Sequence, residues 1–267
     1  MSNRLTRIIV SILAIPFMLG ISYYGRVPFL IFILLIGLAS FYELSVMVKN
    51  RNIFMCNPIG FVSVAILILN SYFHFIQMEI FLISIFSVLL LIELFRNKAS
   101  AINNISTTLF AIFYTGFFAS TLIGIREFYS QDYVNGGLII ISVFITLWMT
   151  DSAAYFIGSA FGKHKLFPRV SPNKSWEGAI AGFIFATITL VVLKIFLLTF
   201  LSLNQIIALG IIIGIFGQIG DLIESLIKRD AGVKDSSNII PGHGGIFDRF
   251  DSLLFSAPLI FIYLRLF

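Results

Sequence analysis

Long apolar stretches recur along almost the whole chain, and they constrain the fold more than any other feature. A helix that crosses a bilayer needs about 20 mainly apolar residues. Stretches of that kind occupy residues 6–24, 28–47, 57–75, 77–95, 105–125, 137–160, 177–200, 203–227 and 251–267. The gaps between them are short, which leaves no room for a separate soluble domain. We therefore expect an all-α polytopic membrane protein with about nine transmembrane helices.

Charged residues are scarce, which supports this expectation. They make up 12% of the 267 residues, whereas soluble domains carry about 25%. Lipid must therefore be the solvent for most of the surface, and the bilayer is the first expected partner. The formal net charge of +5 would suggest nucleic acid in a soluble protein. In a membrane protein the placement of the charges matters more than their sum, so we expect no nucleic-acid partner.

The positive charges are distributed unequally between the two sets of loops. Fourteen Lys and Arg residues fall on the side of the N-terminus and four on or near the opposite side. Because cytoplasmic loops carry the excess of positive charge, we predict a cytoplasmic N-terminus and a C-terminus on the far side. Eight of the fourteen lie in two loops, residues 161–176 and 228–250, which then face the cytoplasm together.

The first apolar stretch follows Arg4 and Arg7, as the apolar region of a signal peptide follows its basic start. No clear small-x-small cleavage site comes after it. We expect this stretch to remain as a helix in a multi-pass protein of a bacterial cytoplasmic membrane.

Acidic residues interrupt several apolar stretches. A carboxylate at membrane depth costs at least about 2.5 kcal/mol unless it faces a polar cavity or a partner. Asp221, Glu224, Ser225 and Lys228 are spaced to share one face of a helix. This face, together with Asp151 in an earlier stretch, predicts a water-filled pocket that opens to the cytoplasm. For each acid alone, a structural ion pair or a protonated, hydrogen-bonded carboxyl is the alternative.

Glu43 and Glu93 differ from those acids, because both lie near predicted cytoplasmic helix ends, close to Lys49 and Arg96. We expect both to be interfacial.

The loop from 228 to 250 is rich in glycine and in cations. Gly242, Gly244 and Gly245 allow the backbone to approach a ligand closely or to adopt a positive φ, and their amides are suited to phosphate oxygens. His243 stands between these glycines, with a phosphate contact or a structural role in the loop as the alternatives. The cations suited to phosphate are Lys228, Arg229, Lys234 and Arg249.

Asp248 and Asp251 follow this loop, three residues apart on one helical face. A helix cap is the alternative account of this pair, but Asp221 enters from the same side. Carboxylates beside cations suit Mg²⁺, which is held by one or two carboxylates together with substrate phosphates. Such a site stabilises in-line attack at phosphorus.

The second basic loop contains the run RVSPNKSWEG before the seventh apolar stretch. Ser171 begins a turn, and Ser175 is placed to cap the following helix. Lys174 then lies at a helix N-terminus, where an anion is favoured. Capping and phosphate binding are compatible here, and we expect both.

These motifs resemble the phosphatidate cytidylyltransferases, also called CDP-diglyceride synthases. The family signature reads Ser-x-apolar-Lys-Arg-x₄-Lys-Asp, then Pro-x-His-Gly-Gly, then Asp-Arg-x-Asp, and it is matched over 27 residues. The matching residues are Ser225, Lys228, Arg229, Lys234, Asp235, Pro241, His243, Gly244, Gly245, Asp248, Arg249 and Asp251. A second family motif commonly reads Ser-Pro-Lys-Lys-Thr-Trp-Glu-Gly, and here Asn173 replaces its first lysine while Ser175 replaces its threonine. Asp151 before Tyr155 is also similar to the family.

The resemblance implies transfer of CMP from CTP to phosphatidate, giving CDP-diacylglycerol and pyrophosphate. It further implies homodimers, Mg²⁺ dependence, and a metal pair, with a second cation beside the Mg²⁺, around Asp221, Asp248 and Asp251. On this basis the catalytic residues are these three acids with Lys228 and Arg229. The residues assigned to substrate contact are Ser171, Lys174, Ser175, Ser225, Lys234, Asp235, His243, Gly244, Gly245, Arg249 and Asp151.

The motifs cover the second half of the chain only. We therefore divide the protein into residues 1–130, expected to serve as scaffold or dimer contacts, and residues 131–267, expected to be catalytic.

An ion-coupled transporter is the alternative from a different functional class. Asp151, Asp221 and Glu224 would then form an ion path. That function predicts internal repeats and helices broken at the midplane, and the sequence has no apparent repeat. It also leaves the basic glycine-rich loop unexplained. A headgroup phosphotransferase is a third class, but its Asp-Gly-x-x-Ala-Arg motif is absent.

Overall fold

The computed structural model describes residues 3–129, 131–240 and 244–267, and most of these residues are helical. The α-helices are α1 (Asn3–Tyr24), α2 (Arg26–Val48), α3 (Asn57–Phe73), α4 (Met78–Arg96), α5 (Ala101–Ala111), α6 (Phe118–Arg126), α7 (Tyr133–Phe161), α8 (Trp176–Phe196), α9 (Leu203–Ile212), α10 (Gln218–Asp230) and α11 (Phe247–Leu266). The other elements are the 3₁₀ turn η1 (Lys49–Arg51), the π-helical turns η2 (Ile112–Phe117) and η3 (Ile213–Gly217), and the strands β1 (Lys165–Phe167) and β2 (Ser171–Ser175).

Each predicted apolar stretch coincides with a helical run. Within the described residues, six runs are long and apolar enough to cross a membrane. They are Arg26–Arg51, Met78–Arg96, Ala101–Arg126, Tyr133–Phe161, Trp176–Phe196 and Leu203–Asp230. Val10–Tyr24 and Asn57–Phe73 are shorter apolar helices. The chain is thus a mostly helical protein of the multi-pass membrane type, while nine crossings and their orientation stay predictions.

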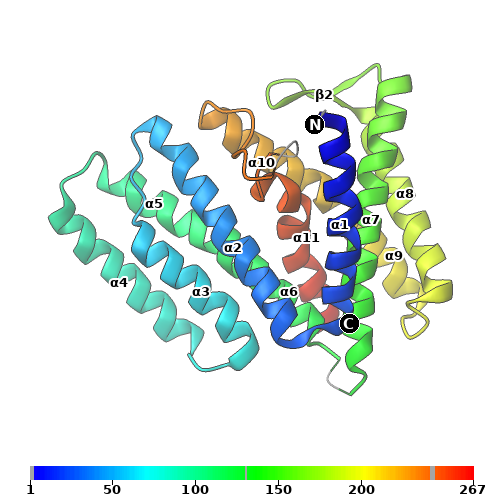
Figure 1. The fold of residues 1–267 in the computed structure, drawn as a ribbon, viewed down its shortest axis with the longest axis horizontal. Coiled ribbons are helices and arrows are strands. Elements are labelled where there is room, and N and C mark those ends of the chain that lie inside the picture. Colours follow the sequence, from blue (N-terminus) through cyan, green and yellow to red (C-terminus); the bar gives the residue numbers. More distant parts are fainter. Residues whose placement is uncertain (1–2, 130, 241–243) are drawn as a thin grey trace.

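The outer surface carries more large apolar side chains than is usual for a water-soluble protein. Phe95 is 82% exposed, Ile102 79% and Phe196 74%. These residues belong to α4, α5 and α8, which lie toward the two ends of the molecule (Figure 1). Soluble monomers rarely expose apolar surface on this scale, so lipid is the solvent that fits these helices.

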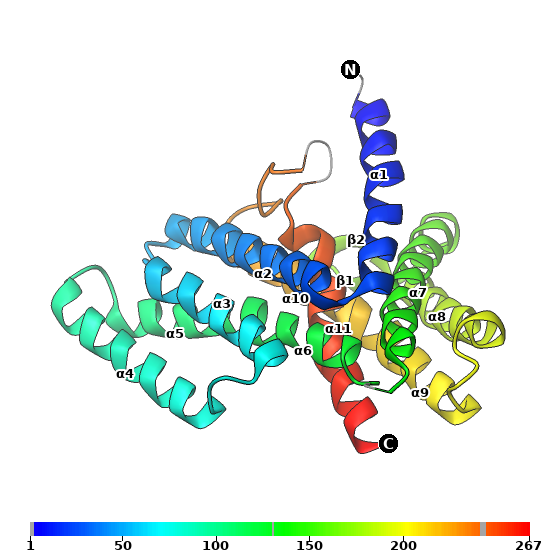
Figure 2. The ribbon, with the colours of Figure 1, turned by 60° about the horizontal axis from the view of Figure 1, so that its bottom comes forward.

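Helix α11 occupies the centre of the fold. It packs against α2, α6, α7, α9 and α10. Helices α3, α4 and α5 lie to one side of it, and α7, α8 and α9 lie to the other (Figures 1 and 2). The buried core runs through the middle, with Ile33, Leu44, Leu122 and Leu254 all fully inaccessible. Residues 1–130 and 131–267 therefore share a packed interface, and their division into two units remains a prediction.

Arg126 joins the end of α1 to the connection between α6 and α7. Its guanidinium is fully buried and donates to the backbone oxygens of Ser22, Tyr23 and Tyr133, each at 2.8 Å. It also lies 4.1 Å from the centre of the Tyr133 ring. The sequence analysis counted the charge of Arg126 only among those on the far side of the membrane, whereas here its side chain ties the end of α1 to the start of α7.

A short hairpin adds strand structure to the expected all-α fold. Strand β1 pairs with β2 in antiparallel fashion, with Lys165 opposite Ser175 and Phe167 opposite Ser171. Because β2 ends where α8 begins, the hairpin holds the loop with Lys174 in a defined conformation. A hydropathy pattern could not predict it, since both strands are short.

Candidate active site

The site is built where α10 crosses α11. Gly220 lies at this crossing, and a Cβ on it would meet the backbone oxygen of Asp251 at 2.8 Å and the Cβ of Phe255 at 2.9 Å. Only a residue without a side chain permits so close an approach. The next residue along α10 is Asp221, so the contact brings Asp221 and Asp251 together.

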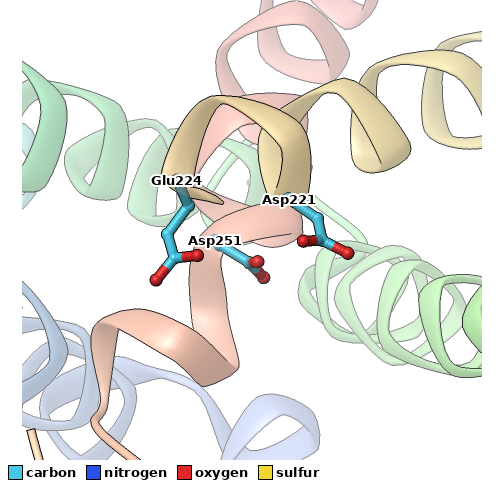
Figure 3. A group of neighbouring side chains, drawn as sticks. All are labelled: Asp221, Glu224 and Asp251. Carbon is cyan, nitrogen blue, oxygen red and sulfur yellow. The ribbon is translucent and has the colours of Figure 1, made fainter. Parts of the chain in front are cut away.

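Asp221, Glu224 and Asp251 form an acidic cluster on one side of the crossing (Figure 3). Each offers a carboxylate oxygen, and these oxygens all lie within 4.8 Å of one another. Glu224 is 1% exposed, and its Oε1 is buried with no hydrogen-bond partner among the described residues. Three converging carboxylates, one with an orphaned oxygen, form a donor set that fits a hard cation such as Mg²⁺.

Asp248 lies beside this cluster, and its oxygens are already engaged. Oδ1 accepts from Lys228 Nζ at 2.6 Å. Oδ2 accepts from the Ser236 amide at 3.0 Å and the Gly245 amide at 2.8 Å, and it lies 2.8 Å from the Ser236 hydroxyl oxygen. Asp248 thus turns toward the loop that precedes α11. The acidic cluster thus contains Glu224 beside Asp221 and Asp251, while the assignment of Asp248 as a metal ligand stays a prediction.

Lys228 connects the two sets of acids. Its ammonium lies 2.7 Å from Glu224 Oε2 as well as 2.6 Å from Asp248 Oδ1, and its side chain is 11% exposed. A buried cation between two carboxylates is well compensated, and removing it would leave both anions unpaired. Lys228 thus holds α10 against the start of α11.

Glu43 on α2 reaches the loop before α11 from the first half of the chain. Its oxygens accept from the hydroxyls of Ser236 and Ser237 at 2.8 and 2.6 Å, and from the amides of Ile246 and Phe247 at 2.9 and 2.8 Å. Glu43 is fully buried. The expectation that it is interfacial is wrong, because its hydrogen-bond donors come from residues about 200 positions away.

Glu93 is also buried rather than interfacial, although it lies 3.5 Å from Arg96 as their spacing suggested. Its second partner is the side-chain amide of Asn104, on α5. Helix α5 therefore covers Glu93, although Glu93 lies near the end of its own helix.

Lys174 brings the second basic loop to the acidic cluster. Its Nζ lies 2.5 Å from Asp221 Oδ2, and the two side chains are 29% and 35% exposed. The Ser225 hydroxyl contacts the other Asp221 oxygen at 3.4 Å. Asp151 on α7 is exposed and lies close enough to Asp221, Lys174 and Arg249 to interact with their charges. The predicted site residues Asp151, Lys174, Asp221, Ser225, Arg249 and Asp251 therefore share one region.

Other predicted residues have roles in the framework. Ser175 caps α8, since its hydroxyl accepts from the Gly178 amide at 3.2 Å, as predicted from its position. Gly244 has φ +83°, and its oxygen accepts from the Ile240 amide. A Cβ on Gly245 would lie 2.4 Å from Glu43 Oε2. These glycines shape the loop, and the Gly245 amide donates to Asp248.

The remaining predicted residues lie at the periphery of the site. Arg229, Lys234 and Asp235 are exposed, and Arg229 donates to the Val233 backbone oxygen at 2.9 Å. Ser171 lies in β2. His243 falls outside the described residues.

The sequence analysis did not assign Glu224, Glu43 or Ser236 to the catalytic or substrate-binding residues. Glu224 shares a helical face with Asp221 and Lys228, so the helical spacing already predicted that it lies beside them. Glu43 and Ser236 had no such signal, because their contact joins segments far apart in the sequence.

Comparisons with known proteins show the family of the chain. A sequence model of the cytidylyltransferase family matches residues 5–267. A phosphatidate cytidylyltransferase of Bacillus subtilis (strain 168) is 34% identical over 269 residues, which cover 98% of this chain and 97% of the relative. One of Staphylococcus haemolyticus is 35% identical over 262 residues, covering 97% and 98%. One of Staphylococcus aureus (strain COL) is 35% identical over 264 residues, with the same coverage.

The family match spans both halves of the chain, including α2 with Glu43 and α10 and α11 with the acidic cluster. The chain therefore belongs to the cytidylyltransferase family.

Proposed function

We propose that this protein is a phosphatidate cytidylyltransferase, a membrane nucleotidyltransferase of phospholipid biosynthesis. It transfers CMP from CTP to phosphatidate and yields CDP-diacylglycerol and pyrophosphate. The observation that carries the proposal is the acidic cluster of Asp221, Glu224 and Asp251 beside Lys174, in a chain that matches relatives of that name over nearly its whole length.

The reaction does not require a strong general base. A phosphate oxygen of phosphatidate, already anionic, forms a bond to the α-phosphorus of CTP. The bond from that phosphorus to the bridging oxygen breaks, and pyrophosphate leaves with the electron pair. The protein must therefore bring two anions together and neutralise charge, which are matters of positioning and electrostatics.

The cations of the site divide into three groups. Lys174 and Arg249 are accessible beside the acidic cluster and are suited to substrate phosphates. Lys228 is buried between Glu224 and Asp248 and holds the framework. Arg229 and Lys234 are exposed on the loop side of α10, where they add positive potential for anionic substrates.

A Mg²⁺ ion would be held by Asp221, Glu224 and Asp251, which offer hard oxygen donors. When bound, it would supply charge neutralisation at the transferring phosphoryl group. Asp248 supports this set through Lys228, its shared partner with Glu224.

We further infer a cytoplasmic N-terminus, nine membrane crossings, residence in a bacterial cytoplasmic membrane, and a homodimer. The N-terminus, the β1–β2 hairpin and the loop after α10 lie at one end of the molecule, and the C-terminus lies at the other (Figure 1). This arrangement agrees with the side predicted for the cationic loops and supports a nucleotide site open to the cytosol.

The proposal is tested with purified protein, CTP labelled at the α-phosphorus, phosphatidate and Mg²⁺. Label should enter the lipid phase in equal amount to the pyrophosphate released, and chelation of the metal should stop it. A parallel liposome assay for ion flux separates the enzyme from the transporter alternative. Ion flux without labelled lipid would overturn the proposal.

A further inference from the structure

A cavity of about 600 Å³ lies apart from the acidic cluster, between α2, η1, α5, the β1–β2 turn and α10. Helix α10 contributes Leu226, Arg229 and Asp230 to its wall. These positions lie on a different face of the helix from Asp221 and Glu224. The cavity is therefore a separate feature, and we call it the arginine cavity.

Three arginines line the cavity, and one carboxylate accompanies them. Arg51 comes from η1, Arg169 from the β1–β2 turn and Arg229 from α10, while Asp230 is the acid. Arg51 Nε donates to the backbone oxygen of Asp230, and Arg229 Nη1 donates to that of Val233. Among the described residues, none of the three arginines lies in an ion pair. A guanidinium carries five N–H donors, so most donors remain available to an anion.

The rest of the wall is apolar. Leu44 and Val48 of α2, Phe110 of α5 and Leu226 of α10 all line the same cavity. A free inorganic anion would gain nothing from these side chains. A ligand with a phosphate at one end and hydrocarbon at the other would contact both parts. The volume falls within the range of about 300–1,000 Å³ usual for small-ligand sites.

We propose that the arginine cavity is a docking site for phosphatidate, distinct from the acidic cluster. The phosphate monoester contacts the guanidinium groups of Arg51, Arg169 and Arg229, which match phosphate oxygens in bidentate fashion. The glycerol and the first methylene groups lie against Val48, Phe110 and Leu226. The inference rests on the proposed function, which supplies the lipid, and it gives α2 and α5 a role in substrate binding.

The test compares the full-length protein with the double variant Arg51→Gln/Arg169→Gln. The matched control is Lys163→Gln/Lys165→Gln, which removes two charges from the same region outside the cavity wall. Binding of dihexanoyl phosphatidate to detergent-solubilised protein is measured directly, with inorganic phosphate as competitor. Steady-state kinetics then give the Michaelis constants for phosphatidate and for CTP.

Loss of two charge-assisted contacts should weaken phosphatidate binding at least about 10-fold. The Michaelis constant for phosphatidate should rise in parallel while that for CTP stays constant, and the control should match wild type. Inorganic phosphate should compete poorly. Unchanged phosphatidate binding in the double variant would overturn the inference, as would competition by inorganic phosphate as strong as that by the lipid.

Two further measurements separate failure of the docking site from failure of the proposed function. If the double variant unfolds, the single variant Arg169→Gln, in an exposed turn, provides the same comparison. Formation of labelled lipid by wild-type protein tests the proposed function independently. If wild-type protein is active but the double variant binds phosphatidate with unchanged affinity, the docking site is contradicted and the enzyme assignment still holds.

Discussion

At the residue scale, one chain of contacts links the first half of the protein to the acidic cluster. Glu43 holds Ser236, Ser236 contacts Asp248, Asp248 pairs with Lys228, and Lys228 pairs with Glu224. Each contact is buried or partly buried, so each is stronger than the same contact in water. A change at Glu43 should therefore reach the site without any contact with substrate.

We predict that Glu43→Gln lowers kcat at least about 10-fold, because an amide nitrogen would face the hydroxyl and amide donors that the carboxylate now accepts. An unsatisfied buried donor costs about 1–3 kcal/mol. The Michaelis constant for CTP should change little, since Glu43 positions the loop and touches no substrate. Glu79→Gln, at an exposed position on α4, is the control. Wild-type kcat in Glu43→Gln would refute the positioning role.

Lys174 gives a different kinetic signature. Lys174→Gln should raise the Michaelis constant for CTP about 10-fold, because a charged hydrogen bond is worth about 1.5–3 kcal/mol. Lys174→Arg should recover part of the loss, since it keeps the charge. The exposed Lys163→Gln provides a comparison on the same side of the protein. Equal CTP dependence for all three variants and wild type would show that Lys174 binds no nucleotide phosphate.

At the element scale, the sequence predicted where helices lie but not how they are interrupted. The stretches 105–125 and 203–227 each contain a π-helical turn, η2 or η3. Such turns occur often at functional sites, and η3 directly precedes α10. Both turns are as apolar as their surroundings, so hydropathy gives no sign of them. They are set by packing, as where Gly214 meets Ala186 and Phe183.

The crossing of α10 and α11 makes a prediction about packing. Gly220→Ala should lower stability by about 1–3 kcal/mol, the usual cost of overpacking, and should lower turnover as Asp221 moves from Asp251. Gly20→Ala on α1 is the matched control, because a Cβ there meets nothing within 4 Å. Thermal unfolding and turnover of both variants give the comparison. Gly220→Ala with wild-type values of both would contradict the role of this close approach.

At the scale of the whole molecule, composition and charge placement predicted the class of protein, while the three-dimensional contacts decided the members of the site. Asp221 and Asp251 could be paired from sequence, since both fall beside basic loops. The engagement of Asp248 with the loop before α11 could not, because it depends on how Ser236 and Gly245 surround Asp248. The contribution of α2 likewise requires the folded chain.

The predicted orientation can be tested with cysteine labelling. Cys56, the chain's single cysteine, is buried, so Cys56→Ala provides a background without reactive thiols. In that background, Lys165→Cys should react with a membrane-impermeant thiol reagent only from the cytoplasmic side. Phe267→Cys should react only from the opposite side. Both cysteines reacting from one side would contradict the predicted topology.

The central claim is that acids from α10 and α11 meet to form the catalytic centre. The most direct measurement is the turnover of purified Asp221→Asn, Glu224→Gln and Asp251→Asn at saturating CTP and phosphatidate across a Mg²⁺ titration. The exposed Asp132→Asn serves as control. We predict a loss of at least about 100-fold in Asp221→Asn and Asp251→Asn, the scale of removing a key electrostatic group, and a weaker response to Mg²⁺ in all three. Near-normal turnover of Asp221→Asn, with an unchanged Mg²⁺ dependence, would contradict the account.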